Sequence, residues 1–327
     1  MDEFDVVVVG GGPGGSACAQ RLGQSGLSVV VLDRAEFPRT KLCAGWVTPE
    51  ALIDLELEPK DYPHSFLTFE GIHVHWKALH VKAKTVQHSI RRYEFDDYLL
   101  RRCGAPVQNH YVRQIRQDGE GYVIDEQFRC RYLVGAAGTK CPVYKALFRN
   151  ANPRAKHLQT VTYEHEFPYQ WDDPNCHLWF FKDNLPGYAW YVPKANGHLN
   201  VGIGGMAEKL KYRGGDIKDH WGRFTDHLGD KAFVRNAPYR PTGYSYYLRG
   251  NVDTVQVGNA FIVGDAAGLA TRDLCEGIGP AVRSGQLAAD SIISGQEYCL
   301  ENVVRYSAEN GLVKRLLEYG FAGGSKQ

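Results

Sequence analysis

FDVVVVGGGPGGSACAQRLGQSGLSVVVLD, residues 4–33, decides the fold of this chain. Its four consecutive valines, Val6 to Val9, predict a strand buried on both faces, as in a parallel sheet. A glycine turn with the G-x-G-x-x-G spacing follows at Gly10, Gly12 and Gly15. Residues 16–22 can form a helix, and the apolar run at residues 29–32 ends in Asp33. Strand, glycine turn, helix, strand and acid in this order predict a dinucleotide-binding unit.

The turn and the start of the helix predict a pyrophosphate site. Glycines let the backbone approach the ligand, while the unpaired N–H groups and positive dipole of a helix N-terminus favour an anion. Pro13 suits the first helical turn, which needs no N–H from it. Asp33 is expected to accept a hydrogen bond from a ribose hydroxyl; Arg34 either lies beside the adenine or is solvated. The alternative is a glycine-rich turn without a ligand, which the complete context disfavours.

Bulk properties set the remaining limits. The 327 residues are enough for a large core and two domains. A net charge of +1 gives no electrostatic case for a nucleic-acid partner. Eight cysteines show neither zinc nor disulfide spacing, and no signal peptide is recognised, so a cytoplasmic location is expected. The apolar runs have strand length, so no transmembrane segment is predicted.

The loop after the first βαβ unit is a candidate site. Lys41-Leu42-Cys43-Ala44-Gly45 follows the C-terminal edge of the predicted sheet, where doubly wound folds bind ligands. Cys43 is either a thiol placed near the cofactor or a small packing residue. Residues 91–103 predict a helix that begins with Arg91 and Arg92, an unfavourable place for cations. A nucleotide phosphate nearby would offset the repulsion between these arginines and the helix dipole. The alternative is that both arginines are exposed surface residues.

Two further stretches predict an antiparallel substrate domain. Residues 68–90 alternate apolar and polar side chains, with His73 and His75 on one face. No carboxylate or cysteine completes a metal set there, so we interpret these histidines as a polar strand face, with no metal. Residues 158–205 contain four successive strand signals, with a hairpin predicted at Asn196-Gly197. Its aromatic residues Trp179, Tyr188, Trp190 and Tyr191 are the candidate substrate contacts.

The C-terminal third predicts a return to the dinucleotide domain. An apolar strand ends in Gly264-Asp265, and Gly277-Ile278-Gly279 opens a helix to about Ile293. This start resembles a second phosphate-binding helix N-terminus, and Asp265 can accept hydrogen bonds from a ribitol-type chain. Residues 208–236 are predicted to be helical. Residues 301–319 predict an amphipathic helix that packs on the domain or makes weak peripheral contact with a membrane.

Four motifs in chain order carry a family resemblance. They are Gly10-x-Gly12-x-x-Gly15 with Asp33, Arg92-x-x-Phe95-Asp96-x-x-Leu99, Val134-Gly135-Ala136-Ala137-Gly138 and Val263-Gly264-Asp265-Ala266-Ala267-Gly268. Over nearly its whole length the chain resembles FAD-dependent oxidoreductases with the para-hydroxybenzoate hydroxylase-type fold. It is most similar to their geranylgeranyl reductase-like branch. Lys41-x-Cys43-Ala44-Gly45 resembles that branch's cysteine-glycine loop, and Tyr188-Ala189-Trp190-Tyr191-Val192-Pro193 with Gly202 resembles its aromatic substrate strands.

The resemblance implies an α/β fold with a discontinuous Rossmann-type FAD domain of glutathione reductase-like fold and an antiparallel-sheet substrate domain. The FAD domain is expected at residues 1–60, 85–150 and 245–300, the substrate domain at 61–84 and 151–244, and the C-terminal helix at 301–327. The FAD-contacting residues would be Gly10, Gly12, Pro13, Gly14, Gly15, Ser16, Asp33, Arg34, Lys41, Cys43, Ala44, Gly45, Arg92, Ala137, Gly138, Gly264, Asp265, Gly277, Ile278 and Gly279.

The chain departs from the family pattern at three points. Asp33 replaces a more usual glutamate, Trp46 is expected to crowd the cysteine loop, and the chain is short after Ile293. The shortness bears on the substrate, because relatives use a longer C-terminal part to help enclose a prenyl chain.

The predicted function is FAD-dependent reduction of a carbon–carbon double bond in an apolar or aromatic substrate, with Cys43 handling a proton. NADPH or another external reductant is the expected electron source. The alternatives are hydroxylation of a small aromatic molecule or a protein side chain, and a non-catalytic FAD-binding accessory protein. A flavin halogenase is a further alternative, because Tyr188-x-Trp190-x-Val192-Pro193 also resembles a W-x-W-x-I-P signature; Lys77 would then carry the halogenating species.

Overall fold

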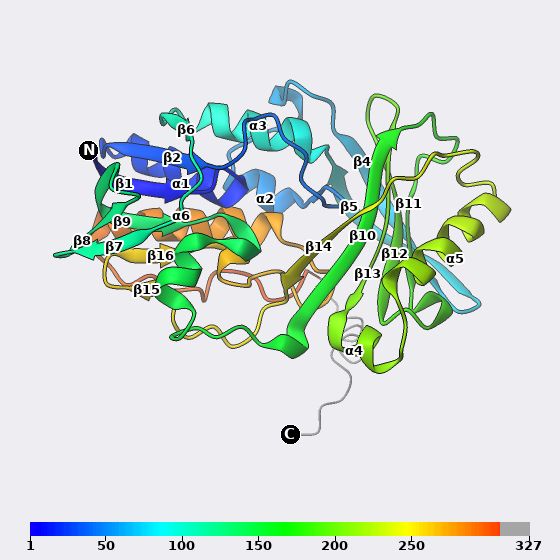
Figure 1. The fold of residues 1–327 in the computed structure, drawn as a ribbon. Coiled ribbons are helices and arrows are strands. Elements are labelled where there is room, and N and C mark those ends of the chain that lie inside the picture. The colour runs from blue at the N-terminus through cyan, green and yellow to red at the C-terminus, as the bar shows by residue number, and fades with distance from the viewer. Residues whose placement is uncertain (308–327) are drawn as a thin grey trace. The chain divides into compact units, whose positions relative to one another are not determined.

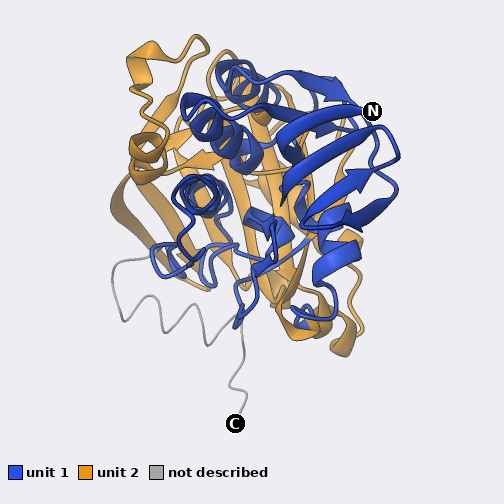
Figure 2. Cartoon of the chain, turned by 90° about the vertical axis from the view of Figure 1, so that its left-hand side faces the viewer, with its two compact units in different colours: residues 1–39, 93–155, 246–307 blue, residues 40–92, 156–245, 308–327 orange. Residues whose placement is uncertain are grey.

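The computed structural model describes residues 1–307, which divide into two units. The first unit contains residues 1–39, 93–155 and 246–307, and the second contains residues 40–92 and 156–245 (Figure 2). The FAD domain was expected to include residues 40–60, but these fall in the second unit, because β3 (Trp46–Val47) pairs with β5 (Leu79–Ser89). The functional assignment of the two units stays a prediction.

The first unit is built on a mainly parallel sheet with the strand order β15-β16-β9-β1-β2-β6 (Figure 1). Its strands are β1 (Asp2–Val9), β2 (Val29–Asp33), β6 (Val107–Asn109), β9 (Phe128–Gly135), β15 (Gln256–Val257) and β16 (Ala260–Ile262). β1 pairs in parallel with both β2 and β9. Val6, Val7 and Val8 are fully buried, as the unbroken β-branched run predicted.

Three α-helices accompany this sheet: α1 (Pro13–Gln24), α3 (Arg92–Arg102) and α6 (Ile278–Ser294). Glycines allow α1 and α6 to pack closely. A Cβ at Gly285 would overlap the carbonyl oxygen of Gly14, and a Cβ at Gly14 would lie 2.8 Å from the carbonyl oxygen of Ala281. The helices α1 and α6, which are far apart in the chain, are therefore joined in one unit through glycine contacts.

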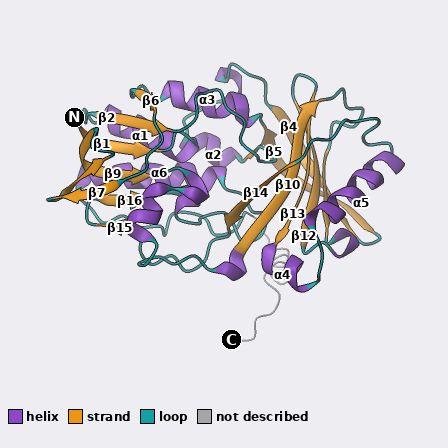
Figure 3. Ribbon diagram, viewed as in Figure 1, coloured by secondary structure: helices purple, strands orange, loops and turns teal. Residues whose placement is uncertain are grey.

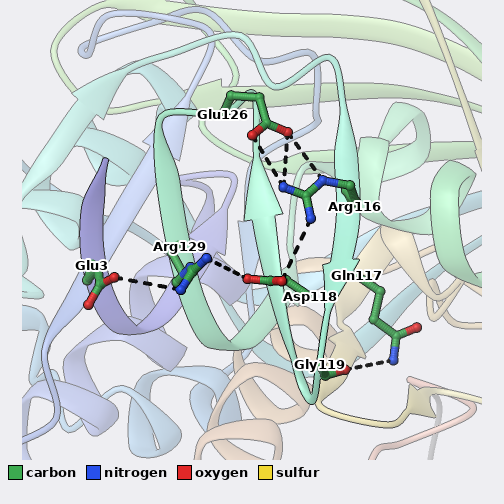
Figure 4. Close-up of polar contacts among 7 residues, drawn as sticks. All are labelled: Glu3, Arg116, Gln117, Asp118, Gly119, Glu126 and Arg129. Atoms are coloured by element: carbon green, nitrogen blue, oxygen red, sulfur yellow. Dashed lines mark hydrogen bonds and ion pairs between the residues drawn. The ribbon is translucent and has the colours of Figure 1, made fainter.

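A small hairpin extends the first sheet and is held by ion pairs (Figure 4). β7 (Ile115–Asp118) and β8 (Gly121–Ile124) continue it beyond β9. Nη2 of Arg129 lies 2.8 Å from Oδ2 of Asp118, and Nη2 of Arg116 lies 3.3 Å from Oε2 of Glu126. These pairs are partly exposed, so each adds little to stability.

The second unit is built on an eight-stranded sheet in the order β14-β10-β13-β12-β11-β4-β5-β3. Its other strands are β4 (Leu67–Trp76), β10 (Gln159–Pro168), β11 (Cys176–Phe180), β12 (Gly187–Lys194), β13 (His198–Met206) and β14 (Thr242–Tyr247). The predicted hairpin between β12 and β13 is confirmed: Asn196 and Gly197 both have positive φ, at 58° and 63°.

One face of the second sheet is covered by α5 (Ile217–Asp230), as Figure 3 shows. Trp221, Phe224 and Leu228 of this helix form a hydrophobic core with Trp179 and Tyr191 of the sheet. The predicted helical stretch at residues 208–236 is divided into α4 (Ala207–Tyr212) and α5, with Gly214 and Gly215 between them. The short helix α2 (Pro49–Asp54) begins after Thr48, whose hydroxyl accepts from the N–H of Ala51.

The helix predicted at residues 301–319 lies mostly outside the described residues. Residues 301–307 are described and form turns and bends rather than a helix. Within residues 1–307, none of the helices combines the length and the apolar character needed to cross a bilayer.

Candidate functional site

The glycine turn after β1 brings the ends of two strands together. Gly10 has a φ of 114°, and a Cβ there would lie 2.5 Å from the carbonyl carbon of Ala136. The N–H of Ala136 donates to the carbonyl of Val9 at 2.8 Å, and Gly138 also has a positive φ, 69°. Glycine is needed at Gly10 because any side chain would meet the backbone that follows β9.

The start of α1 has the properties of an anion site. Its N-cap, Gly12, is extended and makes no side-chain capping hydrogen bond, and the first turn contains no acidic residue. A Cβ at Gly12 would meet only Nη2 of Arg39, at 3.6 Å. The first N–H groups of α1 therefore point from the helix end without a carboxylate to compete for them, which suits a pyrophosphate.

Asp33 is held in place by two backbone amides. The N–H of Gly11 donates to Oδ2 at 2.8 Å, and the N–H of Ala35 donates to Oδ1 at 2.9 Å. Each carboxylate oxygen has further acceptor capacity, so a ribose hydroxyl can also bind. Arg34 is exposed beside it.

Arg39 adds a cation that the sequence did not single out. Its Nη1 lies 3.1 Å from Oδ2 of Asp96, whose side chain is fully buried, and its guanidinium carbon lies 4.6 Å from the ring centroid of Phe37. Its Nη2 faces Gly12 at the start of α1. An arginine held this way presents its charge at the anion site without needing to be ordered by the ligand.

The start of α6 differs from that of α1. Gly277 is its N-cap, and a Cβ there would lie 3.6 Å from Oδ1 of Asp265, so these two predicted residues do meet. However, the N–H of Gly279 donates to Oε1 of Glu276 at 2.6 Å. A carboxylate thus already accepts from one N–H group at this helix start, and the second phosphate site at Gly277, Ile278 and Gly279 stays a prediction.

In the second unit, the loop at Lys41-Leu42-Cys43-Ala44-Gly45 is fixed from several sides. The N–H of Ile90 donates to the carbonyl of Gly45 at 2.9 Å, and the fully buried ammonium of Lys194 donates to the carbonyl of Ala44. The N–H of Gly45 donates to Sγ of Cys43 at 3.3 Å. Burial lowers the pKa of Lys194, while nearby groups, Glu166 first among them, oppose this effect.

A buried carboxyl lies near this loop. Glu164 is 2 % exposed, and burial raises its pKa to about 7, although Lys41 and Asn200 act in the opposite direction. Nδ2 of Asn200 donates to Oε2 of Glu164 at 3.4 Å and to the carbonyl of Cys43 at 3.3 Å. Oδ1 of Asn200 accepts from the indole Nε1 of Trp190 at 2.7 Å. Asn200 thus connects the carboxyl, the cysteine loop and the aromatic strand.

The strand register separates the four predicted substrate aromatics. Trp190 lies opposite Gly202, and Tyr188 lies opposite Gly204, on the face that also carries Glu164. Trp179 and Tyr191 point to the other face and pack in the core beneath α5. Only Tyr188 and Trp190 therefore share a face with the buried carboxyl.

Comparison with known proteins agrees with this geometry. Residues 4–100 match the family model described as pyridine nucleotide-disulphide oxidoreductase. An uncharacterized protein of Methanosarcina barkeri is 30% identical, over 90% of this chain and 76% of its own length. The menaquinone reductase of Mycobacterium tuberculosis is 27% identical, over 90% of this chain and 77% of its own. A geranylgeranyl bacteriochlorophyll reductase-like structure from Thermoplasma acidophilum superposes with a TM-score of 0.78 at 19% identity, covering 98% and 85% of the two chains.

The chain belongs to the same family as the Methanosarcina barkeri protein and is an FAD-dependent oxidoreductase. The predicted α/β flavoprotein fold is confirmed, and FAD is its cofactor. The first unit of the oxidoreductase fits this group: the glycine turn allows close approach, the α1 start is uncapped, and Arg39 faces it. We propose that these groups and Asp33 hold the dinucleotide.

Of the two arginines at the start of α3, Arg91 has a different partner from the one expected. The anion beside Arg91 is a protein carboxylate, because Nε of Arg91 lies 2.9 Å from Oε1 of Glu166. Arg92 is buried at the first residue of α3 and stays a proposed FAD contact. Trp46, expected to crowd the cysteine loop, lies in β3 and pairs with Ser89.

The proposed halogenase lysine is poorly placed. Lys77 is exposed in the turn that follows Trp76, whereas the cysteine loop is tied to Ile90, beyond the other end of β5. Nearly the whole length of β5 separates the two sites. Lys77 therefore lies far from the Cys43 loop, and its halogenase role stays a prediction.

The tertiary structure adds partners to the predicted histidine face. Nδ1 of His73 lies 2.9 Å from Nε2 of His80, and Nε2 of His75 lies 3.0 Å from Nδ1 of His177. Nε2 of His177 lies 3.0 Å from Oδ2 of Asp173. Burial lowers the pKa of His75 and of His177 to about 4. Within residues 1–307, no three ligand-type side chains are arranged to hold a metal ion.

Proposed function

We propose that this oxidoreductase reduces a carbon–carbon double bond of an apolar, isoprenoid-type substrate. FAD held by the first unit would supply the hydride once reduced, and an external reductant such as NADPH would reduce the flavin again. The names of two similar proteins support the substrate class, since one relative is a menaquinone reductase and one solved structure is geranylgeranyl bacteriochlorophyll reductase-like. The aromatic side chains of Tyr188 and Trp190 suit an apolar substrate.

The observation that carries the proposal is the buried carboxyl of Glu164. Reduction of a double bond needs a hydride at one carbon and a proton at the other. With a pKa raised by burial to about 7, Glu164 is partly protonated at neutral pH, whereas an ordinary glutamate is ionised. We assign it the proton-donor role; it becomes a carboxylate when the new C–H bond forms and regains its proton from water. Cys43 is the second candidate for this role.

Asn200 and Lys194 hold Glu164 and the Cys43 loop in position. Asn200 binds both the Glu164 carboxyl and the Trp190 indole, so the proton donor and the aromatic surface have one shared anchor. Lys194 holds the Cys43 loop through the carbonyl of Ala44. Lys41, whose Nζ lies 3.2 Å from the ring centroid of Tyr244, is the main charge that opposes the raised pKa of Glu164.

The proposal is tested by single turnover without oxygen. The FAD-loaded protein is reduced with dithionite and mixed anaerobically with a geranylgeranyl lipid that carries no quinone ring, because a quinone would itself accept the hydride. We expect the absorbance of oxidised flavin to return and the product mass to increase by two hydrogens. A fully saturated lipid of equal length is the matched control and should leave the flavin reduced. Reoxidation only in air, with a product that gains oxygen, would instead establish a hydroxylase.

A further inference from the structure

The hairpin of β4 and β5 exposes apolar side chains on one face. Trp76 is 41% exposed, Leu79 is 56% exposed and Val81 is 46% exposed. Trp76 pairs with Leu79, and Val74 pairs with Val81, so these side chains share a face next to the turn. Exposed apolar residues scattered singly need no explanation, but a contiguous group at the end of a hairpin indicates a contact surface.

The same hairpin is basic. Residues 71–90 contain Lys77, Lys82 and Lys84 and no aspartate or glutamate, although the whole chain has a net charge of only +1. The three lysines are exposed, and none forms an ion pair with another residue of the described range. Lys82 pairs with His73 on the face opposite Trp76. The hairpin is therefore amphipathic, with an apolar face and a basic face.

We propose that the tip of this hairpin, residues 74–84, docks on a bilayer surface that contains anionic lipid. A tryptophan beside aliphatic side chains suits the boundary between headgroups and acyl chains. Lysine stems can cover apolar surface while their ammonium groups reach the headgroups, and lysines near an anionic surface are attracted to it. This inference rests on the proposed function, because an isoprenoid substrate would be dissolved in a membrane.

A second copy of the chain fits this surface less well. β5 pairs with β3 only at His88 and Ser89, so its outer part is a sheet edge. In a two-fold contact, identical hairpins would bring their lysines together, and lysines on an edge strand oppose edge-to-edge pairing. An anionic lipid surface complements the same charges.

The test is co-sedimentation of the full-length, FAD-loaded protein with vesicles. One set contains phosphatidylcholine alone, and the other contains phosphatidylcholine with phosphatidylglycerol. We expect binding to the anionic vesicles and much weaker binding to the neutral ones. K77Q/K82Q/K84Q should weaken the anionic binding by roughly fivefold for each lysine. W76S/L79S should weaken it at least tenfold, because apolar contacts to the acyl boundary are lost.

Matched variants elsewhere in the second unit control for general charge and hydrophobicity. K211Q/K218Q/K231Q removes the same charge, and Y212S removes a side chain that is 93% exposed. Both controls should bind as the native protein does. Equal binding to the two kinds of vesicle, equal losses in the controls, or no binding would overturn the proposal. So would light scattering that shows a dimer disrupted by W76S/L79S.

The assay separates this inference from the proposed reaction. Vesicle binding requires no turnover, so it can succeed when no reductase activity is found. If both ideas hold, W76S/L79S reduces detergent-dispersed substrate at the native rate and vesicle-embedded substrate at a lower rate.

Discussion

The indole of Trp190 lies across Gly202 on the neighbouring strand. The two residues face each other in the β12–β13 register, and a Cβ at Gly202 would overlap the indole ring. In this position Nε1 of Trp190 donates to Oδ1 of Asn200 at 2.7 Å. The glycine therefore sets the orientation of the ring, and through Asn200 it also affects the surroundings of Glu164.

The first prediction concerns this pair. G202A should destabilise the protein by about 1–3 kcal/mol and break the Trp190–Asn200 hydrogen bond, because the ring has to move. Urea unfolding measures the loss. In the W190A background the same alanine should cost less, and the cost that remains is due to the Cβ of Glu164, which would lie 2.7 Å from the added methyl group. G243A is the matched control, since a Cβ there meets nothing closer than 3.5 Å.

The second prediction separates FAD binding from folding. G12A should leave the melting temperature of the FAD-free protein unchanged, because a Cβ at Gly12 meets only Arg39 at 3.6 Å. The same methyl group should lower FAD affinity at least tenfold, since it would occupy the approach to the start of α1. Equilibrium titration followed by flavin fluorescence measures the affinity. G23A, near the other end of α1, should leave FAD affinity unchanged and raise stability slightly, because alanine favours a helix over glycine. Unchanged FAD affinity in G12A would contradict the placement of the pyrophosphate.

The third prediction concerns stability in acid. Burial lowers the pKa of His177 to about 4 in the folded protein, from an ordinary value of 6.5, with His73 adding to the shift and Asp173 opposing it. The unfolded chain then binds more protons between pH 6.5 and pH 4, so the free energy of unfolding falls as the pH drops through this window. His177 alone accounts for roughly 3 kcal/mol.

Urea unfolding at several pH values tests this dependence. H177Q should make the loss of stability between pH 6.5 and pH 4 shallower. H157Q changes an exposed histidine and should leave the slope as it is. An unchanged slope in H177Q would show that His177 is not kept neutral by burial.

The fourth prediction concerns the proton donor. The anaerobic single-turnover rate should decrease as the pH rises through about 7, because Glu164 must be protonated. E164Q should lose this pH dependence and slow the step by about a hundredfold.

The stability of the E164Q variant provides the control. A buried carboxyl with a raised pKa stabilises the fold below about pH 4.5 and loses that contribution as the pH rises through 7, so E164Q should be at least as stable as the native protein at pH 8. A normal rate and pH profile in E164Q would shift the role to Cys43.

Local sequence patterns were sufficient to predict the strands, helices and turns whose conformation depends on a few consecutive residues. The valine run, the glycine turn and Pro13 predicted β1 and α1, because burial and allowed φ values are properties of a few consecutive residues. Asn196-Gly197 predicted its hairpin for the same reason, since both residues tolerate positive φ. The family motifs extended this to the flavoprotein fold and its cofactor.

Some missed residues had a faint signal in the sequence. Asp96 belongs to a motif that the resemblance used, but only the fold shows its ion pair with Arg39. Lys194 is a charged residue at the end of the buried strand β12, which indicates a special role without naming its partner. Glu164 is one of several polar residues on alternate positions of β10, and nothing local distinguishes it from the others.

What only the tertiary structure decided is which side chains meet. Asn200 joins Glu164, Trp190 and the Cys43 carbonyl, although these residues are far apart in the chain. Strand register placed Trp190 on the face of Glu164 and sent Trp179 and Tyr191 into the core beneath α5. A shift of one residue in that register would exchange the two faces. The sequence alone therefore determined the βαβ unit and its cofactor class, whereas long-range pairing determined the buried carboxyl, its partners and the surface left for a substrate.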